Sequence, residues 1–505
     1  MKIGALLLGF SFFLSKILGL IRDHLLAGQF GAGNGAEISA AFNLDTYYAA
    51  FRIPDFLFNQ LSYGVLAAAF IPIFVEIFKK ESIKTAFKFA SDVLRLVTLI
   101  IAGFSIIIFI LAPYILPIFV PGFSKEALDV TVAATRIMLV TPLFFTIGSI
   151  AGGIQNAMNR FFALSLAPLF YNLGIIGGIV FLSKTYGVYG VAIGVAVGSF
   201  VNMLVQLPTI IKMGFKYAPS LKWWNNRVKE MILLSLPRIL GMSVTQVSLI
   251  IDTIIASTLA AGSITVINFA ANLESLPIGI IGVSVAVVSF GTLSAHAADQ
   301  NMHEFTKEIT TNLRRILFLL IPLAFGMFSL RFQIVQIVLE KGAFTNTDTV
   351  LTANTLGFFL IGLMFGGIMF LLARGFYALK NTKTPVKAGI AAVAINIIAS
   401  ILLTKVWKFE TYGLAVANST ADIFNAAVLL ILLSKRLSAN IINLKEIGKF
   451  FAAAILMLIA VHFTKNYFGN VFVQTAVSVV FGALVYFGAC FAMRCEELKV
   501  RIKSL

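Results

Sequence analysis

The chain has 505 residues, of which 59% are hydrophobic and only 12% are charged, and its mean hydropathy is +0.95. This balance excludes an ordinary soluble domain. The formal net charge of +17 is typical of a membrane protein that is oriented by the positive-inside rule and meets anionic lipids, so we expect no nucleic-acid partner.

Apolar segments of about 20 residues or more recur along the chain, and each is long enough to cross a ~30 Å hydrocarbon core as a helix. We therefore predict an all-α polytopic membrane protein with about fourteen transmembrane helices. Lys and Arg concentrate in alternate connections, which places both termini in the cytoplasm. The expected spans are 4–30, 40–78, 92–118, 128–155, 161–183, 187–211, 230–261, 264–294, 309–339, 350–378, 385–405, 411–433, 448–464 and 469–493.

The first two expected helices carry charges that are costly in a bilayer. A charge at the bilayer centre costs about 2.5–3.5 kcal/mol on insertion scales, so we expect their cations to line a hydrated cavity. In the alternative, Arg22 pairs with Asp23 or Asp45 and Lys16 extends to the cytoplasmic interface. The charged residues of these two helices are Lys16, Arg22, Asp23, Asp45, Arg52 and Asp55.

The chain also carries a weak internal repeat. The triplet GVA at 190–192 precedes Asn202, and GLA at 413–415 precedes Asn425 by the same distance. Two six-helix copies and two extra helices account for the expected spans, which implies two pseudo-symmetric lobes with a cavity between them. The predicted parts are residues 1–220 with helices 1–6, residues 221–440 with helices 7–12, and residues 441–505 with the last two helices and a cytoplasmic tail.

Glycine and proline add local expectations. Gly190, Gly194 and Gly198 repeat at four-residue spacing, which favours a close contact with another helix. Pro54 and Pro277 occupy matching places in the two copies and are expected to kink their helices.

Several stretches together resemble one family. They resemble the MurJ (MviN) lipid II flippases of the multidrug/oligosaccharidyl-lipid/polysaccharide exporter superfamily. The stretches are SKILGLIRDHLLAGQFGAG at 15–33, AFRIPDFLFNQLSYGVLAAAFIPIF at 50–74, QNAMNRF at 155–161, SVTQVSLIIDTIIASTLAAGS at 243–263, KGAFT at 341–345 and ARGFYALKNTKTPVK at 373–387.

The resemblance implies a transporter rather than an enzyme. It would move lipid II, the undecaprenyl-diphosphate-linked peptidoglycan precursor, from the inner to the outer leaflet of the bacterial plasma membrane by alternating access. The last two helices would form a groove for the lipid tail, and we expect a monomer surrounded by membrane lipids. The expected substrate-binding residues are Lys16, Arg22, Asp23, Asp45, Arg52, Asn156, Gln246, Asn272 and Glu274.

Two departures from the family pattern keep other cargoes open. Phe58 and Asn272 occupy positions where the resemblance implies arginine. An exporter of another polyprenyl-linked saccharide, or a cation-coupled multidrug exporter of the same superfamily, is therefore an alternative. A membrane-embedded enzyme acting on polyprenyl phosphates is less favoured, because the histidines form no HExxH-type pair.

The second lobe offers oxygen atoms that could hold Na⁺. Spacing of four places Asn396 with Ser400, and Val416 with Thr420, on one face of each helix, and Asp252 would add a carboxylate. In the alternative, Asp252 caps or hydrogen-bonds a kinked neighbouring helix. Proton coupling or the membrane potential alone are further possibilities, and no cofactor is expected because the chain has no GxxxxGK[ST] loop.

Overall fold

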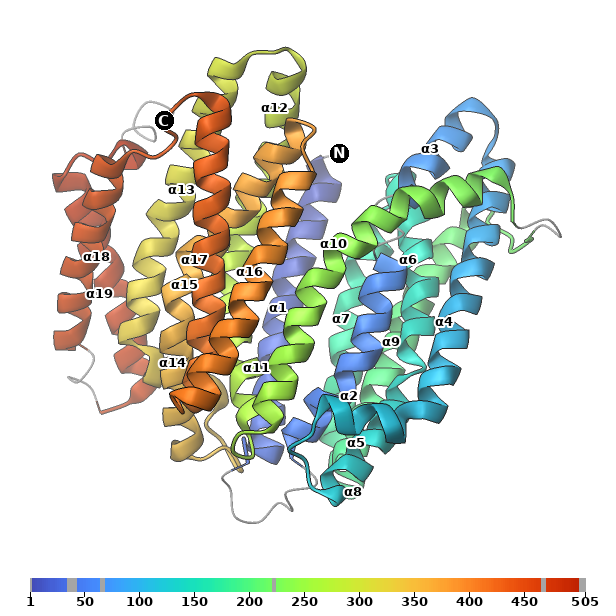
Figure 1. Cartoon of the computed structure of the whole chain (residues 1–505), viewed down its shortest axis with the longest axis horizontal. Coiled ribbons are helices and arrows are strands. Elements are labelled where there is room, and N and C mark those ends of the chain that lie inside the picture. Colours follow the sequence, from blue (N-terminus) through green and yellow to red (C-terminus); the bar gives the residue numbers. More distant parts are fainter. Residues whose placement is uncertain (1, 34–42, 64–68, 220–223, 465–468, 499–505) are drawn as a thin grey trace. The chain divides into compact units, whose positions relative to one another are not determined.

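The computed structural model describes residues 2–33, 43–63, 69–219, 224–464 and 469–498. All the regular elements in these residues are helices (Figure 1). Most are α-helices, and four are short π-helical segments, named η. The predicted all-α class is confirmed.

The helices form two compact units, and each is described by itself. The first unit comprises Met1–Thr265 and Lys341–Thr345. Its elements are α1 (Lys2–Phe30), α2 (Leu44–Leu57), η2 (Phe58–Tyr63), α3 (Ile71–Lys80), α4 (Ile83–Phe119), α5 (Lys125–Met138), α6 (Thr141–Ala157), α7 (Phe162–Gly177), η4 (Gly178–Leu182), α8 (Ser183–Tyr186), α9 (Val188–Lys212), α10 (Asn226–Ser257) and the first turn of α11 (Ser263–Pro277).

The second unit comprises Val266–Glu340 and Asn346–Leu505. After the rest of α11, its elements are η5 (Ile278–Val283), α12 (Ser284–Ala298), α13 (Met302–Ser329), α14 (Arg331–Leu339), α15 (Asn346–Ala378), α16 (Lys383–Ile401), η6 (Leu402–Val406), α17 (Glu410–Leu437), α18 (Leu444–Thr464) and α19 (Val471–Ala492). The predicted boundaries at 220 and 440 rest on the sequence repeat rather than on contacts, and they stay a prediction.

The predicted membrane spans match these helices. In the described residues, 11 helices are long and apolar enough to cross a membrane. The other three predicted spans correspond to α1, to the run from α2 through η2 to α3, and to α10. The chain is thus a multi-pass membrane protein.

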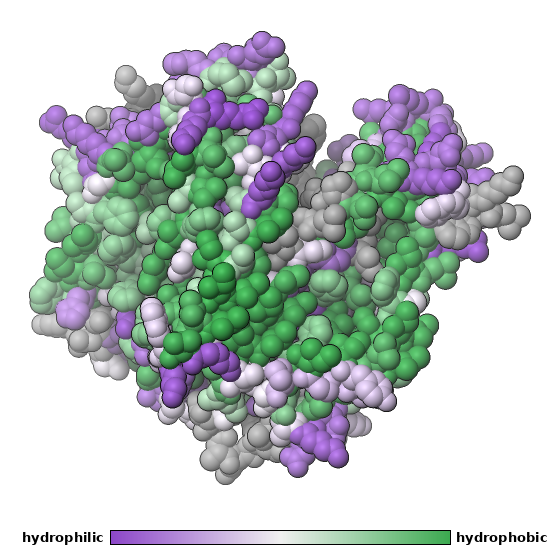
Figure 2. All heavy atoms as spheres, viewed as in Figure 1, coloured by the Kyte–Doolittle hydropathy of each residue, from purple (hydrophilic) through white to green (hydrophobic). Residues whose placement is uncertain are grey.

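Apolar side chains on the outer helix faces suit a lipid environment. In α4, Ile106 and Ile110 are each 61% exposed, although the helix has the highest mean hydropathy of the spans. Figure 2 shows hydrophobic residues covering the middle of the visible helices and hydrophilic residues gathered toward their ends. In water this exposure would be unfavourable, whereas in a bilayer the same faces contact acyl chains.

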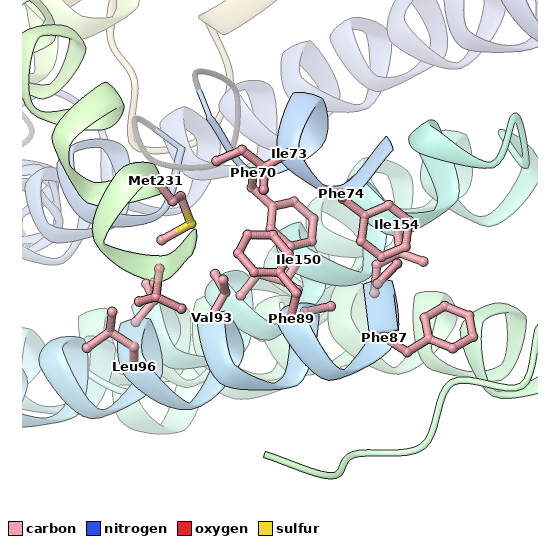
Figure 3. Packing of buried hydrophobic residues seen from close by; sticks show 14 of the residues in the cluster. Phe70, Ile73, Phe74, Phe87, Phe89, Val93, Leu96, Ile150, Ile154 and Met231 are labelled. Atoms are coloured by element: carbon pink, nitrogen blue, oxygen red, sulfur yellow. The ribbon is translucent and has the colours of Figure 1, made fainter. Parts of the chain in front are cut away.

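An aromatic core holds the first unit together where α3, α4 and α6 meet (Figure 3). The rings of Phe70 and Phe89 stack with centroids 5.8 Å apart, and those of Phe74 and Phe87 lie 6.2 Å apart. Ile150 from α6 and Met231 from α10 fill the space beside them. Aromatic pairs at these separations add to the stabilisation from burial.

The internal repeat is visible in the backbone. The π-helical segments η4 and η6 begin at Gly178 and Leu402, a separation close to the 223 residues between Gly190 and Gly413. In both copies a residue with positive φ follows, Gly187 at 55° and Glu410 at 48°. The two copies therefore share a local irregularity as well as a sequence pattern.

The predicted glycine contact is confirmed. Gly194 of α9 packs so closely on Gly178 that a Cβ atom at Gly194 would lie 2.7 Å from the Gly178 Cα. A Cβ at Gly198 would lie 2.5 Å from the carbonyl oxygen of Tyr171 in α7. This close approach of α9 fixes α7, which carries part of the site described next.

Candidate functional site

Arg22 is the centre of a polar cluster inside the first unit. Its Nε and Nη2 donate to Oδ1 of Asp23 at 3.0 and 2.8 Å, and its Nη1 donates to Oδ1 of Asn172 at 3.4 Å. Asn172 in turn donates to Oγ of Ser15, at 3.2 Å, and so joins α7 to α1. The contact of Arg22 with Asp23 that the alternative interpretation gave is present. The favoured interpretation, that the cations line a hydrated cavity, stays a prediction.

This arrangement leaves Arg22 with capacity for another acceptor. A guanidinium has five N–H groups, and the three bonds above use three of them. The side chain of Arg22 is 23% exposed, whereas that of Asp23 is 6% exposed. Asp23 therefore orients the guanidinium from the buried side. Within the described part of the chain, the bonds found leave one N–H on each Nη for an anion.

Arg52 of α2 is bound to α10. Its Nε donates to Oγ1 of Thr253 at 2.9 Å, and it interacts electrostatically with Asp55 and Asp252. Thr253 is held in turn by donating to the carbonyl of Leu249. The carboxylate of Asp252 is thus a neighbour of a cation within the first unit. Both interpretations of Asp252, as a Na⁺ ligand and as a cap of a neighbouring helix, stay predictions.

Asp45 caps a helix. Its Oδ2 accepts from the backbone N–H of Gly262 at 2.7 Å, and its Oδ1 accepts from the N–H and the hydroxyl of Thr265 at 2.8 and 2.6 Å. The first N–H groups of α11 have no partner within the helix, and this carboxylate, only 4% exposed, satisfies two of the N–H groups at that end. Asp45 therefore caps the start of α11, whether or not it also contacts the substrate.

The end of α1 is packed against the KGAFT segment, which belongs to the first unit. The N–H of Ala343 donates to the carbonyl of Gly28 at 3.0 Å. Gly31 and Gly342 both have positive φ, and a Cβ on either would lie within 2.5 Å of a backbone oxygen across the contact. Only glycine fits this approach, which explains the glycines in both motifs.

The other predicted substrate residues lie on several helices. Lys16 is half-buried in α1, Gln246 is half-buried in α10, and Asn156 is exposed at the end of α6. Asn272 and Glu274 lie on α11, where Glu274 is buried and interacts electrostatically with Asp422 of α17. The structure brings together Arg22 with Asp23. Substrate binding by all nine residues stays a prediction.

Phe58 belongs to an aromatic stack rather than to a polar site. Its ring lies 4.9 Å from that of Phe145, which in turn lies 4.9 Å from Tyr171. Tyr171 precedes Asn172, so the stack adjoins the cluster around Arg22. An apolar aromatic surface thus stands where the family resemblance implies a cation.

The residues predicted to hold Na⁺ differ in their surroundings. Asn396 and Ser400 are buried in α16, whereas Thr420 is exposed on α17 and donates its hydroxyl to the carbonyl of Val416 at 2.8 Å. Asp252 belongs to the first unit and the other four to the second. Among the described residues no group of three or more His, Cys, Asp or Glu could hold a metal, and the Na⁺ site stays a prediction.

Sequence reasoning missed three partners of the site. Asn172 is a lone amide in the apolar run of α7, four residues after Pro168, and that isolation was a usable signal. Thr253 and Thr265 carry no such signal, because threonine is common in apolar helices. Only the packing of distant segments identifies them.

The family follows from comparison with known proteins. The family model described as Lipid II flippase MurJ matches residues 36–488. The chain belongs to this family. A probable lipid II flippase MurJ of Thermotoga maritima is 31% identical over 96% of this chain and 95% of that protein. One from Buchnera aphidicola subsp. Baizongia pistaciae is 30% identical over 90% of this chain and 88% of that protein.

Solved structures agree with the MurJ assignment. A lipid II flippase MurJ in an inward closed conformation has a TM-score of 0.83 and 29% identity, and the match covers 98% of this chain and all of that one. An inward-facing multidrug resistance MATE family transporter of the MOP superfamily has a TM-score of 0.71 at 14% identity, covering 83% of this chain and 94% of that one. The second likeness shows a shared fold alone.

Proposed function

We propose that this chain moves lipid II, an undecaprenyl-diphosphate-linked peptidoglycan precursor, from the inner to the outer leaflet of the bacterial plasma membrane. The observation that carries the proposal is the match to the MurJ family over residues 36–488, together with about 30% identity to relatives named as lipid II flippases. A flippase does not alter its cargo covalently, so the proposed activity is transport and not catalysis.

The chemistry of the cluster around Arg22 supports this cargo. A diphosphate is a dianionic or more highly charged group, and a guanidinium binds phosphate oxygens through paired N–H donors. The outward N–H groups of Arg22 would receive the diphosphate while Asp23 and Asn172 hold the side chain. Lys16, one and a half turns earlier on α1, would add a second charge on the same helix.

Alternating access supplies the movement. The family and the related exporters share a fold that places two groups of helices on either side of a pathway, and a change between two states would expose the cargo to each leaflet in turn. Moving one charge across 100 mV is worth about 2.3 kcal/mol, so the membrane potential could bias that change. We propose a monomer, with both termini in the cytoplasm, as the working unit.

A second cargo is favoured by one observation. The stack of Phe58, Phe145 and Tyr171 gives the first unit an aromatic surface beside the cluster around Arg22. Aromatic rings stack on the apolar faces of sugars, so another polyprenyl-diphosphate-linked saccharide is the second candidate. It would use the same cations for the diphosphate and differ in the attached sugar.

Complementation in a bacterium depleted of its own lipid II flippase tests the function. We expect the wild-type chain to restore growth and Arg22→Ala to abolish the rescue. Arg22→Lys should restore growth only in part, because lysine keeps the charge but lacks the paired N–H donors of a guanidinium. Immunoblotting of the membrane fraction must show similar amounts of each variant.

Lys184→Ala is the matched control, because Lys184 is an exposed cation of the same unit outside the cluster. It should complement like the wild type. Failure of the wild-type chain at normal expression would contradict lipid II as the cargo, and full rescue by Arg22→Ala would contradict the role of Arg22.

A further inference from the structure

A pocket of about 370 Å³ lies in the second unit, between the ends of α13 and α18 and the start of α14. The helices α13 and α18 pack against each other along this part of the fold (Figure 1). Its volume falls within the range of about 300–1,000 Å³ that is usual for pockets that bind small molecules. Apolar residues form most of its wall, namely Phe328, Leu458, Ile459 and Phe463.

The pocket opens where the protein meets lipid. Phe463 is 73% exposed, Ile459 is 50% exposed and Phe328 is 45% exposed, although all three lie on helices long and apolar enough to span a membrane. In a bilayer these exposed apolar side chains would face acyl chains, so a lipid is the ligand that this side favours. Such a ligand would cover apolar surface that neighbouring helices leave open.

The pocket also contains a cation, Arg331. Its guanidinium lies 4.6 Å from the ring centre of Phe328 and 4.5 Å from that of Phe332, and its Nη1 donates to the carbonyl of Phe328 at 2.8 Å. Its aliphatic part passes over Gly357 of α15, where a Cβ atom would lie 3.2 Å from the Arg331 Cδ. Two rings and a glycine thus hold the guanidinium in one place.

Arg331 keeps donors for an anion. None of the ion pairs found among the described residues includes it. The bond to Phe328 uses one of its five N–H groups. The exposed imidazole of His462, which also lines the pocket, offers a further N–H donor.

We propose that this pocket binds one anionic diacyl phospholipid from the leaflet that surrounds the ends of α13 and α18. The phosphate would accept from Arg331 and His462, and one acyl chain would lie along Leu458, Ile459 and Phe463. The charge of the headgroup distinguishes the possible lipids. A guanidinium should bind an anionic phospholipid more tightly than phosphatidylcholine, whose phosphate is balanced by its own choline. With the predicted cytoplasmic N-terminus, this leaflet is the outer one.

The proposal does not depend on the cargo of the transporter. Its residues belong to the second unit, whereas the cluster around Arg22 belongs to the first. A bound phospholipid would fill the pocket between α13, α14 and α18 and stabilise the packing of these helices. The site would therefore make the stability of the second unit depend on the lipid composition of the membrane.

Native mass spectrometry of the purified full-length chain tests the site. The protein in detergent is titrated with phosphatidylglycerol and, separately, with phosphatidylcholine of the same acyl chains, and the first binding constant is measured for each. We expect the wild type to prefer phosphatidylglycerol. Arg331→Gln should weaken the binding of phosphatidylglycerol about tenfold, since it removes charge-assisted hydrogen bonds, and should abolish the preference.

Two further variants separate the pocket from general surface charge. Ile459→Trp fills the apolar part while it keeps Arg331, and it should also weaken the first binding of phosphatidylglycerol. Lys184→Gln, an exposed cation of the first unit, should leave it unchanged. Equal binding of the two lipids by the wild type, undiminished binding by Arg331→Gln or by Ile459→Trp, or an equal loss in Lys184→Gln would each overturn the proposal.

Discussion

The charged side chains in the helices of the first unit have defined polar partners. Arg22 is held by Asp23 and Asn172, and Arg52 donates to Thr253. Hydrogen bonds of this kind reduce the cost of placing ions in a medium of low dielectric constant. The predicted presence of functional charges in the first two helices is therefore compatible with a stable fold, because Arg22 and Arg52 have acceptors nearby.

Asp45 gives a prediction at the scale of one residue. Asp45→Asn keeps an oxygen for Thr265 but turns an NH₂ group toward the N–H of Gly262, so one buried donor loses its acceptor. We expect the free energy of unfolding to fall by about 1–2 kcal/mol. Thermal unfolding of the purified protein in detergent measures this as a lower melting temperature.

Asp129→Asn is the control for this measurement, because Asp129 is an exposed carboxylate on α5 of the same unit. Its melting temperature should match that of the wild type. If Asp45→Asn behaves like Asp129→Asn, the capping bonds do not stabilise the protein.

At the scale of helices, glycine contacts and π-helical segments determine how elements pack. Gly194 and Gly198 let α9 approach η4 and α7 until their backbones touch, and α7 then presents Asn172 to α1. The segments η4 and η6 recur in both copies at the same place. Such segments are frequently found at functional sites, and here they precede the turns that begin α9 and α17.

Gly194→Leu tests this contact. A side chain at Gly194 would force α9 away from η4 and α7, because its Cβ would lie 2.7 Å from the Cα of Gly178 in η4 and 2.9 Å from the carbonyl oxygen of Gly174 in α7. We expect a destabilisation of several kcal/mol, as for other overpacked interiors, and loss of the monodisperse protein peak in size-exclusion chromatography. Complementation should be lost with it.

Gly177→Leu is a matched control on the neighbouring helix. A Cβ atom at Gly177 meets nothing within 4 Å, so this substitution adds the same side chain without a clash. It should leave the elution profile unchanged. A normal profile for Gly194→Leu would show that the contact tolerates separation.

At the scale of the whole molecule, hydropathy and the distribution of charge determine how the chain crosses the membrane. Lys84 lies at the start of α4, and Lys125 lies past its other end, at the start of α5. These two positions are predicted to lie on opposite sides of the membrane. The native Cys490 and Cys495 are buried and free, so an introduced exposed cysteine can be labelled selectively.

The orientation is tested with a membrane-impermeant maleimide on intact cells. Lys125→Cys should react from outside, whereas Lys84→Cys should react only after the membrane is opened, because positive charge near α4 is predicted to stay in the cytoplasm. Both positions are exposed, so reactivity reports sidedness. The opposite pattern would reverse the predicted orientation.

The sequence by itself determined the helical class, the membrane spans, the internal repeat and the glycine contact on α9. The class, the spans and the glycine spacing depend on residues that are close together in the chain, since a window of about 20 residues contains the hydropathy signal of a span. The repeat needs only the comparison of two stretches of sequence and no knowledge of their packing. From the sequence, Arg22 had two possible partners, Asp23 and Asp45, and the pair that forms, Arg22 with Asp23, is a contact between neighbours in the chain.

Only the tertiary structure decided which distant groups complete the site. Arg22 meets Asn172 across 150 positions, Arg52 meets Thr253 across 201, and Asp45 meets Gly262 across 217. No local pattern contains these pairs, because they arise from the packing of distant helices. A short window of sequence does not specify which helices become neighbours. The pocket around Arg331 has the same origin, since its walls come from helices that lie more than a hundred residues apart in sequence.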